Sequence, residues 1–129
     1  MQLTSRAQML AEFDAIDAIA RRLAAIATRR DAERKQDLIV ARRELAAHVV
    51  TVMTIGEHYP PIRRDEALYA ELRQRLNQLR AAIADHQARW SAVTIDSDDA
   101  AYVASSDAVQ AAGRDFMQWI RRAVESARE

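Results

Sequence analysis

The fold is decided by the stretch Leu38–Trp90, which reads LIVARRELAAHVVTVMTIGEHYPPIRRDEALYAELRQRLNQLRAAIADHQARW. Its apolar residues recur at spacings of three and four, the period of an amphipathic helix. Tyr59-Pro60-Pro61 interrupts this period, because proline lacks a backbone donor and restricts the residue before it. The stretch therefore predicts a hairpin of two long helices over about 31–58 and 63–93. It also contains all three histidines of the chain, His48, His58 and His86.

The apolar faces of these two helices are the seams along which we expect them to pack. The first seam comprises Leu38, Ala41, Leu45, His48 or Val49, Val52, Ile55 and Tyr59. The second comprises Tyr69, Leu72, Leu76, Leu79, Ile83, His86, Trp90 and Val93. Because the second set alternates spacings of three and four as a heptad does, it favours packing at a shallow angle.

Another amphipathic helix is predicted before the hairpin, over about 4–29, with Thr4 or Ser5 as its N-cap. Glu12 falls largely on its polar side. Its apolar face comprises Met9, Phe13, Ile16, Ala20, Leu23 and Ala27. The polar run Thr28–Lys35 is the expected corner, with Asp31 a candidate N-cap for the next helix. A single helix through this run would be roughly 80 Å long, and its apolar face would lie uncovered.

The last helix is predicted over about 98–128, after a loop at 94–99 that is rich in capping residues. Its seam comprises Tyr102, Val109, Ala112, Phe116, Ile120 and Ala123, with Trp119 at the edge. Gly113 costs a helix about 1 kcal/mol relative to Ala, so we expect it to mark a close approach of another helix. Four helices with short connections predict an all-α, up-down-up-down four-helix bundle in one domain over 1–129.

The composition supports this fold class and excludes several functions. Gly and Pro together number four, too few for a sheet with many turns. There is no cysteine, which excludes disulfides, thiolate metal sites and cysteine nucleophiles. The 19 basic and 19 acidic residues cancel and are mixed along the chain, whereas a nucleic-acid-binding protein usually has a basic face. We therefore expect no nucleic-acid partner.

The chain carries no signal for a membrane or for export. No apolar run approaches the roughly twenty residues of a membrane span. The first six residues lack the basic start and apolar block of a signal peptide. We therefore expect a cytoplasmic protein without a membrane partner.

The histidines are the first candidates for a site, because helical bundles hold metals between facing helices. His48 and His86 lie on or beside the seams, but the hairpin register separates their levels by roughly 20 Å, too far for one metal. The Glu-x-x-His pairs of di-iron bundles are absent, and the nearest pattern is Glu44 with His48 at i+4. We expect His48 and His86 to be partly buried structural residues and His58 to be a solvated loop residue.

The arginine pairs are the next candidates, since they could bind an anion. They are Arg21-Arg22, Arg42-Arg43, Arg63-Arg64 and Arg121-Arg122. Because they are scattered over different helices with acidic residues between them, we expect them on solvated faces. The chain also lacks a glycine-rich phosphate loop and a Gly-x-Ser-x-Gly elbow, so we expect no enzyme.

Leu45-Ala46-Ala47-His48, followed by Gly56-Glu57-His58-Tyr59-Pro60, resembles the second helix of hemerythrin-like (HHE cation-binding) domains. The run Ala88–Ile95, with Phe116 and Ile120-Arg121-Arg122, is similar to bacterial members of that group. The family binds a non-haem di-iron centre through histidines on all four helices and two bridging carboxylates.

Carried onto this sequence, that ligand set is largely missing. Only His48 matches a ligand position, and Val52 stands where a carboxylate is expected four residues later. Trp90 stands where a partner of His86 would stand, and the first and last helices have no histidine. The resemblance therefore implies a member that has kept the bundle and lost the metal site.

Three hypotheses for function follow. The leading one is a non-enzymatic hemerythrin-like bundle without a di-iron centre, which acts through protein–protein contacts or binds a small apolar ligand between its helices. The second is a metal- or oxygen-binding bundle with an altered ligand set, His48, Glu44 and Glu12, and non-haem iron as the cofactor. The third is a dimerising regulatory module, a homodimer, suggested by the alanine-rich helices and by Trp119.

Overall fold

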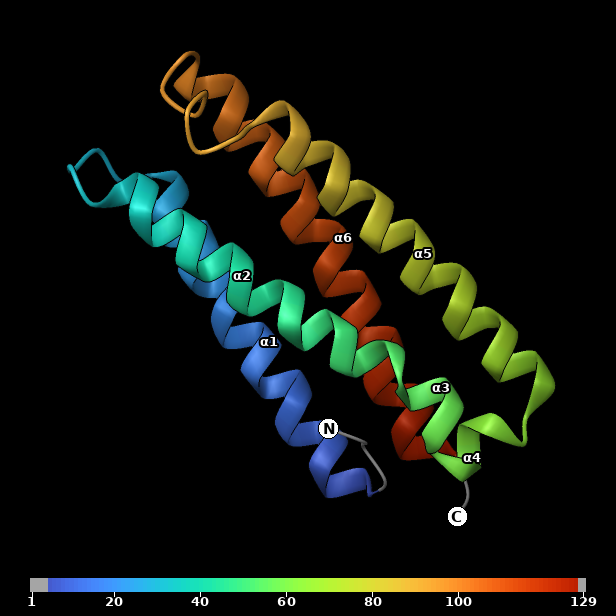
Figure 1. The fold of residues 1–129 in the computed structure, drawn as a ribbon. Helices are drawn as coiled ribbons and strands as arrows, with labels where there is room; N and C mark the ends of the chain where they lie inside the picture. The colour runs from blue at the N-terminus through green and yellow to red at the C-terminus, as the bar shows by residue number, and fades with distance from the viewer. Residues whose placement is uncertain (1–4, 128–129) are drawn as a thin grey trace.

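Helices account for nearly all of residues 5–127, the part of the chain that the computed structural model describes. Four are long: α1 (Arg6–Ala27), α2 (Arg34–Met53), α5 (Glu66–Arg89) and α6 (Asp99–Ser126). Two short ones, α3 (Ile55–His58) and α4 (Pro60–Arg63), connect α2 to α5. The long helices alternate in direction (Figure 1), so the predicted all-α, up-down-up-down bundle is confirmed.

The first two helix starts show how local sequence sets the boundaries. Ser5 is the N-cap of α1, where its hydroxyl accepts a hydrogen bond from Gln8 N at 3.1 Å; Thr4, the other candidate, lies outside the described residues. The predicted corner is present between Ala27 and Arg34. The prediction that Asp31 caps α2 is wrong, because Glu33 holds that position. Asp31 instead accepts from the backbone N of Glu33 at 3.1 Å.

The two prolines do not end the helix before them; they lie at the start of the next one. Helix α2 ends at Met53, and Thr54 separates it from the short α3. Tyr59 is extended (φ −100°, ψ 106°), and Pro60 then occupies the first position of α4, where its missing N–H would have no helical partner anyway. The predicted helix over 31–58 is thus two consecutive helices.

The third long helix ends earlier than predicted. Trp90 leaves the helical conformation (φ −119°, ψ 69°), and the loop that follows buries Ile95 completely. Val93, predicted as a seam residue, is 81% exposed. Asp98 then caps α6 by accepting from Ala101 N at 3.1 Å. The periodic pattern continued past the real helix end because it carries no information on where the chain turns.

The two glycines differ in the space around them. An added Cβ on Gly113 would meet nothing within 4 Å, so the prediction of a close helix approach there is wrong. An added Cβ on Gly56 would lie 3.2 Å from the ring of Tyr69 and 3.3 Å from Leu72. The close approach is therefore at the α3 end of the bundle, and space is left at the middle of α6.

The core divides into two clusters at opposite ends of the bundle. One gathers around α3 and α4 and contains Met9, Phe13, Val52, Ile55, Tyr59, Ile62, Leu72, Phe116, Ile120 and Val124. The other lies near the two loops at the opposite end and contains Ile26, Ala27, Leu38, Ala41, Trp90, Ile95 and Tyr102. Between them the predicted seam residues are only half-buried: Leu45, Val49, Leu79, Ile83 and Val109.

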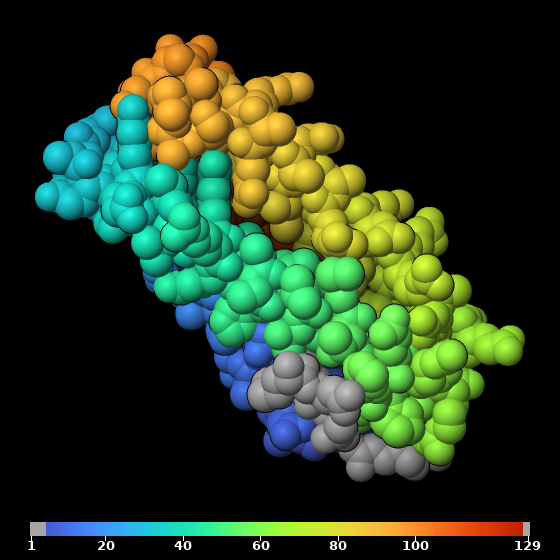
Figure 2. Space-filling view, in the orientation of Figure 1, coloured from blue at the N-terminus to red at the C-terminus, as the bar shows by residue number. Residues whose placement is uncertain are grey.

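The middle is open because one pair of neighbouring helices stays apart. Helix α1 packs against α2 and α6, and α5 packs against α6, but α2 and α5 form no interface of comparable extent. Figure 2 shows a hollow between α2 and α5 in which atoms of α6 are visible. We call this hollow, with its lining residues from the four long helices, the α2–α5 slot.

Candidate functional site

The floor of the α2–α5 slot is an apolar cavity of about 90 Å³. Among the described residues, its lining is apolar apart from Asp17, Gln110 and Arg114. Each long helix contributes apolar side chains, among them Ile16, Leu45, Val49, Leu79, Ile83 and Val109. The side-chain amide of Gln110 has a partner within the protein, because its Nε2 donates a hydrogen bond to the Ala20 carbonyl at 2.9 Å.

A shallow groove of about 220 Å³ lies above this floor, between the outer edges of α2 and α5. It shares Leu45, Val49 and Ile83 with the cavity, so the two lie against the same side chains. At its edge Val50 is 60% exposed and Met53 is 37% exposed. The slot therefore offers apolar surface from the bundle interior out to the solvent.

One end of the slot is polar, and Arg42 is its charged group. Arg42 is half-buried, and its Nη2 donates to the Trp90 carbonyl at 2.7 Å. Within residues 5–127 it forms no ion pair with a carboxylate. Burial lowers the pKa of Arg42, against the opposing influence of Tyr102. A desolvated guanidinium without a counter-ion is thus built into the slot.

His86 and Tyr102 lie beside this arginine. Nδ1 of His86 is 2.7 Å from Oγ of Ser105, and the imidazole stacks on the Tyr102 ring with 5.9 Å between centroids. Burial, and then the charge of Arg42, lower the pKa of His86, which favours the neutral imidazole. Burial also raises the pKa of Tyr102, which keeps its phenol protonated.

The three residues of the predicted altered metal set separate into two pairs. Nδ1 of His48 is hydrogen-bonded to Oε1 of Glu12, from α2 to α1. Glu44 turns away and pairs with Arg22 instead. Glu12 is only 8% exposed, so its expected place on the polar side of its helix is wrong: α2 covers it. The structure brings His48 and Glu12 together and leaves Glu44 on the surface.

The other two histidines of the chain lie apart from this pair. His58, expected in a solvated loop, is the last residue of α3 and is half-buried. His86 is engaged with Ser105 and Tyr102 rather than with a carboxylate. In the described part of the chain, no three His, Cys, Asp or Glu side chains are grouped so that they could hold a metal ion.

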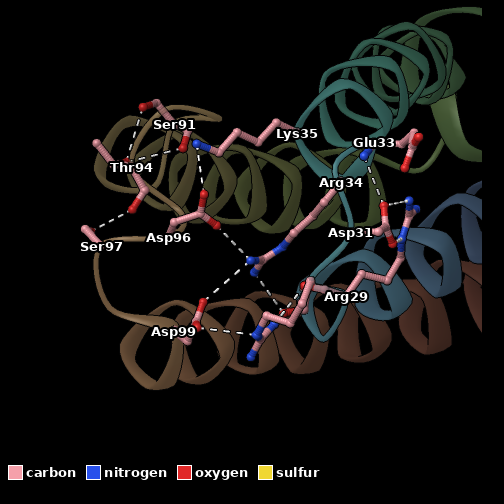
Figure 3. A network of polar contacts seen from close by, with 12 residues as sticks. Arg29, Asp31, Glu33, Arg34, Lys35, Ser91, Thr94, Asp96, Ser97 and Asp99 are labelled. Atoms are coloured by element: carbon pink, nitrogen blue, oxygen red, sulfur yellow. Dashed lines mark hydrogen bonds and ion pairs between the residues drawn. The ribbon is translucent and has the colours of Figure 1, made fainter.

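A second polar group, which we call the loop cluster, joins the two loops at the far end (Figure 3). It is centred on Arg34, only 2% exposed, and includes Arg29, Asp31, Lys35, Asp96 and Asp99. Arg34 donates to Ala27 O at 3.1 Å and to Asp96 Oδ1 at 3.0 Å, and lies 3.5 Å from Asp99 Oδ1. Lys35 also pairs with Asp96 at 2.9 Å. The cluster fastens α2 to the loop between α5 and α6.

Sequence reasoning missed the burial of Arg34 and the partial burial of Arg42. Arg42 was expected on a solvated face together with Arg43; Arg43 is exposed, but Arg42 is not. A signal was present, because Arg34, Leu38, Arg42 and Leu45 follow one another at spacings of four, four and three. That spacing places the arginines on the apolar face of their helix.

Known proteins add no family to this geometry. Comparison of the chain with protein-family models, with curated proteins and with solved structures gave no match in any of the three. No helix among residues 5–127 combines the length and apolar character needed to cross a bilayer. The function must therefore be argued from the slot itself.

Proposed function

We propose that this protein is a non-catalytic binding module of hemerythrin-like type, without a di-iron centre, which holds a small apolar ligand in the α2–α5 slot. The observation that carries the proposal is the pair of neighbouring apolar spaces, the cavity and the groove, that share the side chains of Leu45, Val49 and Ile83. Positions at which the resemblance expects a carboxylate and a partner of His86 instead carry Val52 and Trp90. The pairing of His48 on α2 with Glu12 on α1 supports the family relationship.

The volumes define the kind of ligand. An apolar cavity of about 150 Å³ accommodates a benzene ring, and the floor of the slot measures about 90 Å³. A compact ring is therefore too large for the floor alone. A slender alkyl chain fits better, because it can lie on the floor and extend into the groove of about 220 Å³. Each methylene that leaves water contributes about 0.8 kcal/mol.

The test uses uncharged alcohols, so that only the apolar contact is measured. Octanol, decanol and dodecanol are titrated by calorimetry, and the melting temperature is recorded at saturating ligand. We expect affinity to rise roughly tenfold for each two added methylenes and the melting temperature to rise with it. An affinity independent of chain length would contradict the proposal.

Gly113→Leu provides the matched structural test. A side chain at this position grows into the open space of the slot, so the variant should fold and should no longer bind the alcohols. Ala111→Leu is the control, because Ala111 is exposed on the same helix. Unchanged binding by Gly113→Leu would show that the alcohols occupy another place.

Metal content separates this proposal from the metal-binding alternative. Elemental analysis of the purified protein, followed by anaerobic addition of ferrous iron and exposure to air, should give no stoichiometric iron and no oxo-bridge absorption. Two irons per chain would instead establish a working hemerythrin-like centre. His48→Ala would then locate it: the loss of iron would assign the metal to the His48–Glu12 pair.

A homodimer is the second candidate, favoured by Val50 at 60% and Met53 at 37% exposure on the edge of the slot. Trp119, which first suggested dimerisation, is covered by the Arg75 guanidinium at 4.9 Å from its ring centroid. A second copy would therefore cover the groove rather than Trp119. Sedimentation showing a clean monomer at high concentration would exclude this candidate, and a Val50→Asp variant that becomes monomeric would support it.

A further inference from the structure

We infer that the ligand of the α2–α5 slot is an amphiphilic carboxylate, with its head group at Arg42 and its alkyl chain on the apolar floor. The inference rests on the proposed function, since it concerns the same slot, and it adds the chemical class of the ligand. It joins two independent features: a guanidinium that lacks a counter-ion and an apolar channel that begins beside it.

The unmatched guanidinium is the first step. Five other arginines have carboxylate partners within 3.0 Å: Arg22, Arg29, Arg34, Arg75 and Arg121. Arg42 is half-buried and donates one N–H to the Trp90 carbonyl, which leaves its other donors without a protein acceptor among the described residues. A carboxylate can accept two parallel N–H bonds from a guanidinium. A bound carboxylate would therefore be the acceptor that the described part of the protein does not provide for these donors.

The space beside Arg42 is the second step. A pocket of about 30 Å³ is lined there by Arg42, His86, Gln87 and Tyr102 among others, whereas a single water needs only about 10–15 Å³. No Asp or Glu is among its described lining residues, so no acidic side chain competes for the guanidinium. The Tyr102 hydroxyl makes no hydrogen bond with any described residue and is a second donor.

The connection to the apolar floor is the third step. The head-group pocket shares Leu23, Leu45, Ile83 and Val109 with the 90 Å³ cavity. Beside α2 the side chains that line the two spaces extend from Arg42 to Val52, roughly 15 Å at the helical rise per residue. That is the span of a medium-length alkyl chain. A ligand with one anionic end and one apolar tail therefore matches both the order and the length of the slot.

The test compares head groups on one chain length. Dodecanoate, dodecanol and dodecyl phosphate are titrated below their micelle concentrations, with the fluorescence of Trp90 and Trp119 and calorimetry as readouts. We expect dodecanoate to bind about tenfold more tightly than dodecanol, the gain of a charge-assisted hydrogen bond. Dodecyl phosphate should bind less tightly than dodecanoate, because its tetrahedral head is larger than the pocket.

Substitutions then assign the head group to Arg42. Arg42→Met should lower dodecanoate affinity about tenfold and leave dodecanol affinity unchanged, and Arg42→Gln repeats the test with a polar side chain. Arg43→Met removes the same charge from the adjacent exposed position and should change neither affinity. Circular dichroism confirms that each variant is folded.

The outcomes separate the two proposals. Equal binding of dodecanoate and dodecanol, or full dodecanoate binding by Arg42→Met, overturns this inference and leaves the apolar slot in place. Binding of dodecyl phosphate at or above the dodecanoate level overturns the choice of a carboxylate. If neither dodecanoate nor dodecanol binds, both this inference and the proposed function are wrong.

Discussion

The loop cluster and the α2–α5 slot each contain a desolvated arginine of α2. The two arginines, Arg34 and Arg42, lie about two helical turns apart and differ in the partners around them. Arg34 is 2% exposed and has two carboxylates and a backbone carbonyl around it. Only its Nε lacks a hydrogen-bond partner among the described residues. Arg42 is half-buried and has one backbone carbonyl.

The difference distinguishes a structural joint from a candidate binding site. A buried charge is tolerated when paired charges and hydrogen bonds replace its water. The loop cluster largely meets that condition, because Ala27 of α1, Asp96 of the loop between α5 and α6, and Asp99 of α6 surround Arg34. It therefore adds rigidity to that end of the bundle. The slot does not meet it, and Arg42 remains in contact with space that a ligand can enter.

The largest expected effect is at the loop cluster. Arg34→Met removes the central cation and leaves the Ala27 carbonyl and the two aspartates without it. We expect a loss of about 2–3 kcal/mol in the free energy of unfolding, measured by urea denaturation. Arg30→Met changes an exposed arginine that lies 3.3 Å from Asp99 at the edge of the same cluster, and it should cost much less. Equal losses would show that burial of Arg34 has no special role.

The next effect concerns packing in the slot. Gly113→Ala adds a Cβ where nothing lies within 4 Å and removes the helical penalty of glycine, so we expect a gain of about 1 kcal/mol. The same change at Gly56 places Cβ 3.2 Å from the Tyr69 ring, so that variant should be less stable than Gly113→Ala. The two melting temperatures are compared directly; the opposite order would mean that the slot is more tightly packed than the α3 end.

A smaller effect on the free energy of unfolding is expected at Arg42. Arg42→Met removes a desolvated charge that has no counter-ion and loses one hydrogen bond to Trp90 O. These changes oppose each other, so unfolding free energy should change by less than about 1 kcal/mol. The measurement is the same denaturation series as for Arg34→Met. A loss as large as that of Arg34→Met would remove the contrast between the two regions.

The smallest effect is a pH dependence in the slot. His86 faces Arg42 on α2 and Tyr102 and Ser105 on α6, and its pKa lies below the usual 6.5 because of burial and Arg42. The folded state therefore binds fewer protons than the unfolded state just below pH 6.5, and this contribution to stability is lost as pH falls through the lowered pKa.

His86→Gln should reduce that loss. Denaturation of the wild type and the variant is compared between about pH 7.5 and pH 5.5, a range that brackets the ordinary histidine pKa. The wild type should lose more stability on acidification than His86→Gln does. A His58→Gln variant is the control on the short helix α3, and it should follow the wild type. Parallel curves for His86→Gln and the wild type would contradict the assignment.

Much of the fold follows from residues close together in the sequence. Ser5, Asp65 and Asp98 each accept a hydrogen bond from an N–H three residues later, so these helix starts are local events. The spacing of apolar residues defines the seams. Those two signals were enough for the order, the direction and most of the lengths of the four long helices. They failed at Val93 and Asp31, because both residues lie in loops, whose conformation the spacing of apolar residues does not predict.

The candidate site depends on the distances between helices, and the spacing of apolar residues along one helix does not predict these distances. Glu12 looks solvent-facing on its own helix and is buried because α2 covers it. Leu45, Val49 and Ile83 look like core residues and are half-buried because α2 and α5 stay apart. Whether an arginine on an apolar face receives a carboxylate is likewise decided by another segment of the chain.

The sequence by itself thus determined four amphipathic helices and most of the residues they bury, because these follow from propensity and from residues within one or two turns. Only the tertiary structure decided that the bundle is closed at both ends and open between α2 and α5. It also decided that Arg34 meets Asp96 and Asp99 while Arg42 meets no carboxylate among the described residues. The physical reason is that burial and charge pairing depend on how near two separate helices come, and helical periodicity specifies direction but not distance.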